Sequence, residues 1–407
     1  MPAGSRPSAE DFAGPPSKAD LARWEEADRS ALPTRIGRVR ARLAEHGLDA
    51  YFGIRREHMR YLAGLRLDEG EEKVAGHSGQ FLIGGDETVV LADTRYTIQA
   101  NREALGARVE AVTYDLPARW AELLASLGAR RVGVEAALVS HALWLRLVAA
   151  APDVELVPIE GWVEADRAIK EPAEIERITA ACAVADRALA RLLPAIRPGV
   201  TERELAWQLE GLMRTNGAEA LAFDVAALAG AEAALPHGAP GDRPIAAGQV
   251  LLFDFGAQVG GYRSDMTRTL FVGEPGAENV ALYEVVAAAQ QAAIDALASA
   301  VAPRGERPTG REIDAIARRS IEADGRWPAY GHGLGHGIGL ATHEGPSLSR
   351  SAPQTPLPSP TVFSVEPGIY LEDRLGVRIE DLVLFDAEAH RLERLTHFPR
   401  EVLVVGI

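Results

Sequence analysis

The stretch LLFDFGAQVGGYRSDMTRTLF, residues 251–271, carries two aspartates within an otherwise largely apolar pattern. Gly260-Gly261 at its centre is typical of a two-residue turn, so the stretch predicts a β-hairpin. In that register Asp254 faces Thr267, which is two residues from Asp265. Residues two apart on a strand share a face, so both carboxylates are diagonal neighbours on one face, roughly 7 Å apart at Cβ. A loop one residue longer or shorter would place them on opposite faces.

A second pair of carboxylates, Glu366 and Glu380, shows a similar arrangement. They lie in the apolar stretches VFSVEPGIY and GVRIEDLVLF, and EDRLG (residues 372–376) between them predicts a turn. Because the separation of the two glutamates is even, a loop of odd length places both on one face. Arg378 shares the face of Glu380 and can fix the orientation of a carboxylate. The alternative is an Arg–Glu pair of structural value alone.

Glycine occupies every second position in GHGLGHGIG, residues 331–339. In an extended chain His332 and His336 point one way, and a bare glycine face lets another backbone or a substrate approach closely from the other side. A histidine on such a strand can bind a metal ion through one ring nitrogen. Two more histidines, His237 in ALPHGAP and His343 in THEGP, are by themselves better explained as loop residues without a role.

Five side chains of the metal-ligand type therefore fall in apolar or glycine-rich stretches: Asp254, Asp265, His336, Glu366 and Glu380. Burying a carboxylate in an apolar strand is costly unless a cation or hydrogen bonds compensate its charge. Four carboxylates and one histidine suit two divalent ions, for which Mn²⁺, Co²⁺, Fe²⁺ and Zn²⁺ match the ligand chemistry. Two such ions hold a bridging hydroxide and polarise a carbonyl, which indicates hydrolysis.

The 407 residues divide into three segments of different character. Residues 1–30 are polar and rich in proline and alanine, and we expect a loose arm or a short peripheral helix there. Over residues 31–168, strand and helix patterns alternate, which predicts an α/β domain. Residues 169–407 separate strands from helices, with helices over about 276–323, and predict an α+β domain.

Composition limits the partners and the compartment. The formal net charge of −15 argues against a nucleic acid or an anionic membrane as partner, because both require clustered lysine and arginine. Cys182 is the single cysteine, so no intramolecular disulfide forms, and we expect it to be a small buried residue. We expect a cytoplasmic protein without a signal peptide and without a segment of membrane-spanning length.

The order Asp, Asp, His, Glu, Glu in these contexts resembles the pita-bread metallopeptidases. This family includes methionine aminopeptidases, Xaa-Pro aminopeptidases (aminopeptidase P) and Xaa-Pro dipeptidases (prolidases). Four motifs in the family order carry the resemblance and cover most of residues 172–407: DFGAQVGGYRSDMTRT, GHGLGHGIGLATHEGP, FSVEPGIY and GVRIEDLVL. The first domain resembles that of creatinase and the proline-specific branch. The resemblance implies an α/β creatinase-like N-terminal domain followed by an α+β pita-bread catalytic domain.

The resemblance also implies a role for each ligand-type residue. Asp254 would bind one metal ion, and Asp265 and Glu380 would bridge both ions. His336 and Glu366 would complete the second site. Glu366 would also accept the proton of the bridging water, which acts as the nucleophile. The expected ions are two divalent cations, with Mn²⁺ first and Co²⁺, Zn²⁺ or Fe²⁺ as alternatives.

Around the ligands, the resemblance assigns four further residues. His237 and His343 match histidines that bind substrate, stabilise the tetrahedral intermediate or transfer protons. Arg378 matches an arginine beside the bridging glutamate. His332 lies close by in sequence and is a candidate for substrate binding. The expected substrate is a small peptide with proline at its second position, and homodimers are common in the family.

The exact specificity stays open between related activities. ALPHGAP, HEGP and VEPGIY are the proline-specific versions of their motifs, and LADTRYTIQA resembles the aminopeptidase P form of the first domain. We lean slightly to an Xaa-Pro dipeptidase, which should close its pocket behind the proline and offer a cation to the product carboxylate. Arg55 and Arg56 are candidates for this cation, although they are better explained as solvated surface arginines. The alternatives are an Xaa-Pro aminopeptidase with an open pocket, a methionine aminopeptidase, a creatinase-like hydrolase, and a binding module without catalysis.

Overall fold

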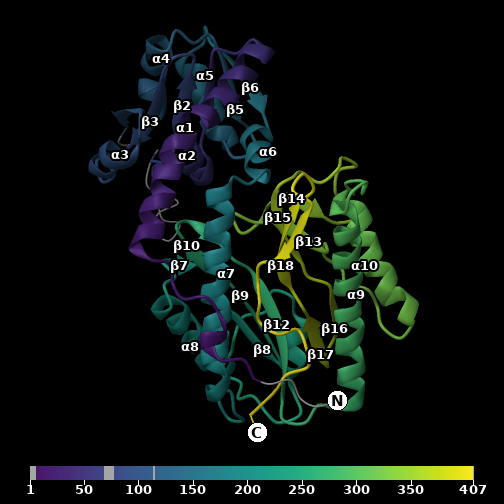
Figure 1. The fold of residues 1–407 in the computed structure, drawn as a ribbon. Helices are drawn as coiled ribbons and strands as arrows, with labels where there is room; N and C mark the ends of the chain where they lie inside the picture. Colours follow the sequence, from purple (N-terminus) through teal and green to yellow (C-terminus); the bar gives the residue numbers. More distant parts are fainter. Residues whose placement is uncertain (1–5, 68–77, 113–114, 407) are drawn as a thin grey trace. The chain divides into compact units, whose positions relative to one another are not determined.

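Strand and helix patterns alternate in the first part of the chain and separate in the second, and the architecture follows this division. The computed structural model describes residues 6–67, 78–112 and 115–406. It divides into two units, one over Ala22–Asp166 and one formed by the N-terminal segment up to Leu21 together with Arg167–Ile407 (Figure 1). We refer to them as the N-terminal unit and the catalytic unit.

The N-terminal unit is built on one sheet with the strand order β4-β3-β2-β1-β5-β6. β1, β5 and β6 are parallel to one another, whereas β2 is antiparallel to both of its neighbours. Short runs such as AYFG, FLIG and TVVLA form its central strands, and every residue of these three runs is buried. The strands are β1 (Ala50–Gly53), β2 (Phe81–Gly84), β3 (Thr88–Ala92), β4 (Arg108–Ala111), β5 (Arg131–Glu135) and β6 (Glu155–Ile159).

Helices accompany this sheet: α1 (Lys18–His46), α2 (Arg56–Ala63), α3 (Thr97–Glu103), α4 (Leu116–Ser126), α5 (His141–Ala150) and α6 (Trp162–Ala168). The sheet packs against Trp120 and Leu123 of α4 and Leu147 of α5. This confirms the predicted α/β architecture.

The first long helix begins earlier than the sequence indicated. We expected a loose arm or a short peripheral helix over residues 1–30 and the first domain from residue 31, but one helix, α1, begins at Lys18, continues to His46 and contains Pro33 in its interior. A proline inside a helix removes one backbone hydrogen bond, which is why it reads as a start signal in the sequence. Buried side chains on both sides of it, Trp24 and Val39 among them, hold the helix together across this position.

The catalytic unit begins with a pair of capped helices. α7 (Pro172–Leu192) starts with a proline in its first turn and with a capping box between Glu171 and Glu174. α8 (Glu202–Thr215) starts with the capping box of Thr201 and Glu204. Cys182 lies fully buried in α7, and burial raises the pKa of its thiol well above the usual value, as expected of a packing residue.

Four groups of paired strands follow in the catalytic unit. Their orders are β20-β12-β9-β8, β14-β13-β15-β18-β19, β11-β10-β7 and β16-β17. The first-half strands are β7 (Ala220–Leu221), β8 (Ala226–Ala229), β9 (Val250–Phe255), β10 (Ala257–Val259), β11 (Tyr262–Arg263) and β12 (Met266–Val272). The others are β13 (Gly335–Gly337), β14 (Glu344–Leu348), β15 (Thr361–Val365), β16 (Gly368–Leu371), β17 (Leu375–Arg378), β18 (Asp381–Asp386), β19 (Arg391–Arg394) and β20 (Val404–Val405).

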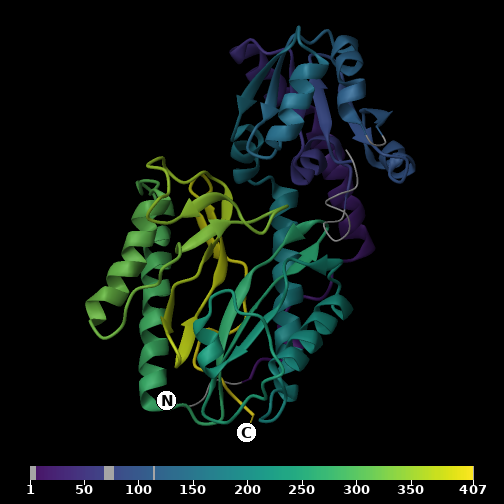
Figure 2. The same ribbon diagram turned by 180° about the vertical axis from the view of Figure 1, so that it is seen from behind.

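Two helix pairs flank these strands. α7 and α8 lie along one side, and α9 (Ala277–Val301) and α10 (Gly310–Asp324) lie along the other, as both views show (Figures 1 and 2). The core between α9, α10 and the strands contains residues such as Val286, Ile313 and Phe363. The segregation of strands and helices confirms the predicted α+β class, with the strands curved around the site described below.

α9 contradicts one expectation about length. Its 25 residues include an 18-residue window of mean hydropathy 1.2, which is long and apolar enough to cross a membrane by length and composition. A helix buried in a protein core can be equally long and apolar, and α9 contributes Leu282, Ala289 and Leu297 to the core cluster of the catalytic unit. The apolar composition of α9 therefore has a structural explanation within the fold.

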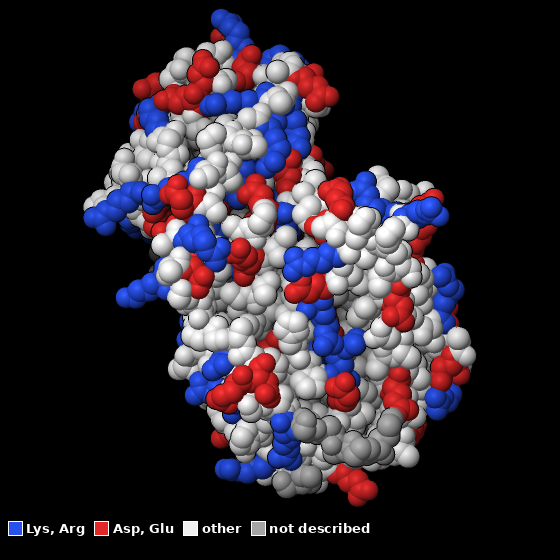
Figure 3. All heavy atoms as spheres, viewed as in Figure 1, with Lys and Arg blue, Asp and Glu red and all other residues white. Residues whose placement is uncertain are grey.

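Charged side chains are mixed on the surface. On the face that Figure 3 shows, lysine and arginine side chains alternate with aspartate and glutamate side chains. Among the described residues visible there, the basic side chains do not merge into one continuous patch.

Candidate metal centre

The hairpin of β9 to β12 has the register that its glycine turn predicted. Asp254 faces Thr267 in the β9–β12 ladder, and β10 and β11 close the hairpin around a two-residue turn. The turn residues, Gly260 and Gly261, have φ angles of 56° and 83°, which favour glycine at both positions. The prediction that places Asp254 and Asp265 on one face is thus confirmed at the level of register.

Glu366 and Glu380 lie opposite each other where two ladders meet. β16 and β17 are joined by the three-residue loop 372–374, an odd length as the sequence argument required. The same register continues into the β15–β18 ladder, where Val365 faces Asp381. Glu366 follows Val365 and Glu380 precedes Asp381, so the two side chains start from neighbouring positions at the junction of the two ladders.

His336 lies on β13 between two backbones that approach very closely. A Cβ atom added to Gly335 would lie 1.9 Å from the carbonyl oxygen of Ser364, and one added to Gly337 would lie 2.0 Å from that of Gly345. Only glycine allows these approaches. The bare glycine face predicted from the sequence therefore packs against neighbouring backbone, and His336 projects from the opposite face.

The extended conformation is shorter than the glycine alternation indicated. β13 covers only Gly335–Gly337, and its pairing with β14 is interrupted by a register shift after His336. His332 lies before the strand, where its Nε2 is 2.9 Å from the hydroxyl of Tyr370 and its Nδ1 is 2.7 Å from the carbonyl oxygen of Gly333. It still lines the cavity of the site.

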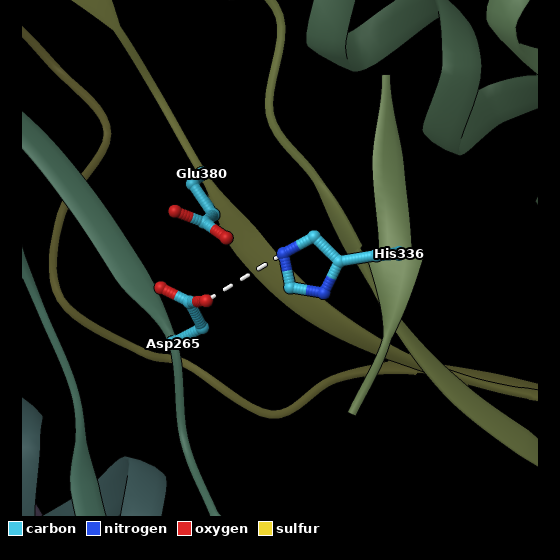
Figure 4. Close-up of side chains that lie close together, drawn as sticks. All are labelled: Asp265, His336 and Glu380. Atoms are coloured by element: carbon cyan, nitrogen blue, oxygen red, sulfur yellow. Dashed lines mark ion pairs between the residues drawn. The ribbon is translucent and has the colours of Figure 1, made fainter. Parts of the chain in front are cut away.

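Three of the predicted ligands converge on one point. One ligand atom each of Asp265, His336 and Glu380 lies within 4.8 Å of the others, and the three side chains point toward one another from separate segments (Figure 4). His336 Nε2 is 3.7 Å from Asp265 Oδ2 and 3.3 Å from Glu366 Oε1. Asp254 and Glu366 line the same cavity, so all five predicted residues border it.

The carboxylates are crowded and incompletely paired. Burial, and then the negative charges of Glu380 and Asp254, raise the pKa of Asp265 well above its usual value. Burial followed by the charges of Glu366 and Asp254 does the same to the pKa of Glu380. Among the described residues, Asp254 Oδ1 and Glu380 Oε1 are buried without a hydrogen-bond partner. Oxygen donors in this state fit divalent cations, which would neutralise the cluster and satisfy these atoms.

Arg378 has a different partner from the one we expected. The sequence placed it beside Glu380, but its Nη2 donates to Asp254 Oδ2 at 2.5 Å. Its Nε donates to Thr267 Oγ1 at 2.8 Å, and its Nη1 donates to the hydroxyl of Tyr370 at 3.0 Å. Thr267 in turn donates to Glu380 Oε2 at 2.7 Å. Among the described hydrogen bonds, the arginine thus reaches Glu380 through the threonine hydroxyl.

Sequence reasoning missed three hydroxyl residues of the site: Thr267, Ser364 and Tyr370. Ser364 Oγ donates to Glu366 Oε1 at 2.9 Å and accepts from the backbone N–H of His336 at 3.0 Å. The signal was present for two of them, because Thr267 and Ser364 each lie two residues from a predicted ligand and so share its face. Tyr370 lies four residues after Glu366 and shares its face by the same rule, but this greater spacing is a weaker signal.

His237 and His343 border the same cavity, which has a volume of about 610 Å³. The ring of His343 is 4.2 Å from that of His336, centroid to centroid. Burial, together with the neighbouring His336 and His237, lowers the pKa of His343 to about 4. A neutral imidazole at this position can accept or donate a hydrogen bond without adding positive charge to the site.

The comparison with known families matches this geometry. A model of metallopeptidase family M24 matches residues 176–387, which is more than half of the chain. The chain belongs to metallopeptidase family M24. A model of the creatinase/prolidase N-terminal domain matches residues 35–169 of this M24 peptidase, so both halves of the predicted architecture are confirmed. Membership of the family supports divalent metal ions at the carboxylate cluster.

Individual relatives extend over most of the M24 peptidase. An Xaa-Pro dipeptidase of Pyrococcus furiosus is 40% identical over 249 residues, which cover 61% of this chain and 69% of that protein. The structure of an Xaa-Pro dipeptidase from Bacillus anthracis is 33% identical, with a TM-score of 0.82 over 92% of this chain and 100% of that one. An X-Pro aminopeptidase from Thermotoga maritima is 35% identical, with a TM-score of 0.76 over 88% of this chain and 98% of that one.

Proposed function

We propose that this M24 peptidase hydrolyses the Xaa-Pro bond of small peptides and releases the N-terminal residue, with a lean to Xaa-Pro dipeptides. The observation that carries the proposal is the single cavity that all five ligand-type side chains border together with His237 and His343. The two relatives described as Xaa-Pro dipeptidases support the choice of bond.

The proposed ligands are Asp254, Asp265, His336, Glu366 and Glu380, and Mn²⁺ is the ion we propose first, because a set rich in carboxylates suits a hard divalent cation. Bound ions supply a Lewis acid that polarises the scissile carbonyl and lowers the pKa of water. Glu366 is the proposed general base, since its carboxylate borders the cavity and Ser364 orients it by a hydrogen bond.

The histidines complete the proposed mechanism. His343 and His237 are at the cavity wall, where an imidazole N–H can donate a hydrogen bond to the oxygen that becomes negative as the carbonyl is attacked. His332 is held by Tyr370 and is proposed to contact the substrate. Arg378 orients the carboxylate of Asp254 through its 2.5 Å hydrogen bond.

An apolar section of the cavity wall favours proline. Phe223, Val225, Pro236 and Pro240 contribute to the lining beside the polar residues. An Xaa-Pro bond is a tertiary amide without an N–H, so a site that recognises it must rely on the ring, the carbonyl and the free amine. Apolar contacts suit the ring, and the carboxylate cluster suits the amine.

A second candidate, an Xaa-Pro aminopeptidase acting on longer peptides, is favoured by one feature of the cavity. Among its described lining residues, Arg378 is the sole lysine or arginine, and it already donates to Asp254, Thr267 and Tyr370. The catalytic unit thus offers no further cation there to the free carboxylate of a dipeptide. Arg55 belongs to the N-terminal unit, where its Nε lies 3.6 Å from Glu164 Oε1.

Turnover of Xaa-Pro, Xaa-Pro-Yaa and Met-Ala-Ser peptides, measured with and without added Mn²⁺, tests these proposals. We expect hydrolysis of the proline peptides and none of Met-Ala-Ser. Cleavage of Xaa-Pro-Yaa but not of Xaa-Pro would replace the dipeptidase by the aminopeptidase. Cleavage of Met-Ala-Ser alone would reject both proline-specific activities. A creatinase-like hydrolase would turn over creatine and none of the three peptides. Absence of both metal and turnover would indicate a binding module.

The remaining expectations are also proposals. We propose a cytoplasmic homodimer that binds neither nucleic acid nor membrane, as the charge of −15 and the single buried cysteine favour. Light scattering coupled to gel filtration measures the mass of the assembly. A mass equal to that of the 43.5 kDa chain would contradict the dimer.

A further inference from the structure

A buried ion cluster lies directly beside His343. The carboxylate of Glu344 forms short contacts with the guanidinium of Arg167 at one oxygen and with the ammonium of Lys170 at the other. The three side chains are 6%, 3% and 0% exposed, so this is an interior cluster and not a surface pair. Lys170 Nζ also donates to the carbonyl oxygen of Arg167 at 2.6 Å.

The two cations of this cluster keep the carboxylate of Glu344 ionised. Burial alone would raise the pKa of Glu344, but the neighbouring Lys170 and Arg167 outweigh it and lower that pKa. Glu344 is therefore an ionised carboxylate held by two cations. Buried ion pairs have strict geometry, since each charge must keep its partner in the low-dielectric interior.

The surrounding backbone is folded onto the cluster. A Cβ atom at Gly339 would lie 2.5 Å from Glu344 Oε1 and 2.8 Å from Lys170 Nζ, so the glycine there lets the chain pass directly over the ion pair. The backbone N–H of Lys170 donates to the carbonyl oxygen of Pro360 at 2.8 Å, just before β15. The cluster thus connects three segments that are far apart in sequence.

His343 is held from its other side as well. The hydroxyl of Thr342 accepts from Arg263 Nη1 at 2.9 Å and donates to the carbonyl oxygen of Ala222 at 3.0 Å. The residues before and after His343 are therefore both anchored by buried polar contacts, while His343 itself faces the cavity. Glu344 is not among the residues that line that cavity, so it has no direct access to a substrate there.

We propose that Glu344, clamped by Lys170 and Arg167, is a positioning residue that fixes His343 in its working position at the cavity. The proposal rests on the proposed role of His343 in hydrolysis. The clamp sets the backbone direction on one side of His343, and Thr342 sets it on the other. Loss of the clamp leaves the metal ligands in place but lets the imidazole move away from the reacting carbonyl. A displacement of about 1 Å at a catalytic group can lower the rate of reaction strongly.

A double-mutant cycle between Glu344→Gln and His343→Ala tests the proposal on the Mn²⁺-loaded full chain. We expect Glu344→Gln to lower kcat by about 10- to 100-fold, with KM and bound metal nearly unchanged. In the His343→Ala background the same substitution should change kcat by less than about 2-fold, because its effect passes through the histidine. An equal loss in both backgrounds would overturn the positioning role and leave the proposed function intact.

Controls separate positioning from folding. His343→Ala alone must lower kcat; if it does not, the proposed role of His343 fails, and the positioning proposal fails with it. Asp186→Asn removes a carboxylate of similar burial that accepts only from the backbone of His397 and Phe398, and we expect it to leave kcat within about 2-fold. Should Glu344→Gln not fold, the cycle is run with Lys170→Arg, which keeps the charge and alters the geometry of the clamp.

Discussion

Arg378 donates a hydrogen bond of 2.5 Å to Asp254, although 124 residues separate them in the chain. The bond joins the end of β17 to β9 and leaves Asp254 Oδ1 without a partner among the described residues. One oxygen of the carboxylate is therefore held by the protein, while the other has no described partner and belongs to a residue that borders the cavity. Such outer contacts orient metal ligands and are needed for full affinity and activity.

Arg378→Lys should lower kcat/KM for an Xaa-Pro peptide by about 10- to 100-fold, since lysine cannot reach three acceptors with fixed geometry. The side chain of Arg378 is 4% exposed and binds Asp254, Thr267 and Tyr370, so each lost bond removes a contact that orients a residue of the site. Steady-state kinetics and metal analysis measure the effect. Arg374→Lys, in an exposed pair with Glu278, is the matched control and should retain full activity.

Asp254→Asn, Asp265→Asn and Glu380→Gln should each abolish activity through loss of metal while the fold survives. Asp265→Asn and Glu380→Gln also relieve repulsion among the carboxylates, so the melting temperature of these two metal-free variants should not fall. Asp254→Asn removes the charge that pairs with Arg378, so its melting temperature should be lower. Activity, bound metal and thermal unfolding are measured on the same samples. Near wild-type turnover in any of the three variants would show that the ligand assignment is wrong.

Metal binding should stabilise the protein more at higher pH. Burial and neighbouring charge raise the pKa values of Asp265 and Glu380 in the metal-free fold. A group with a raised folded-state pKa stabilises the fold below its unfolded pKa, and this contribution is lost as pH rises through the folded pKa. The metal-free protein therefore loses this stability above about pH 4, whereas ion binding requires deprotonated carboxylates.

The measurement is the difference in melting temperature between Mn²⁺-loaded and EDTA-treated protein. We expect a clearly larger difference at about pH 7.5 than at about pH 5.5. Asp265→Asn should reduce the difference at both pH values, because it removes a proposed ligand. A difference that shrinks with rising pH would contradict the assignment of the buried carboxylates as the binding groups.

The sequence predicted the two hairpins of the site because short-range rules govern them. A two-residue glycine turn allows one register, which placed Asp254 opposite Thr267. The even spacing of Glu366 and Glu380 required a loop of odd length to place them on one face, and the loop that is present has three residues. These inferences needed only the alternation of side chains along a strand. The same alternation pointed to the bare glycine face beside His336.

The sequence did not predict the contacts between segments that lie far apart in the chain. The pairing of Arg378 with Asp254 depends on how β17 packs beside β9, and local periodicity carries no information about that. The clamp of Glu344 by Lys170 and Arg167 joins positions more than 170 residues apart for the same reason. The start of α1 was missed because a proline favours the first turn of a helix, whereas tertiary packing holds α1 together across Pro33.

The close approach at β13 gives a last prediction, with its control in the same motif. Gly335→Ala should destabilise the catalytic unit by about 3 kcal/mol or more, since the new methyl would lie 1.9 Å from a carbonyl oxygen of the neighbouring strand. Gly331→Ala adds the same methyl where no atom lies within 4 Å and should leave stability unchanged. Urea unfolding of both variants measures the difference. Equal stabilities of the two variants would contradict the close approach of β13 and β15.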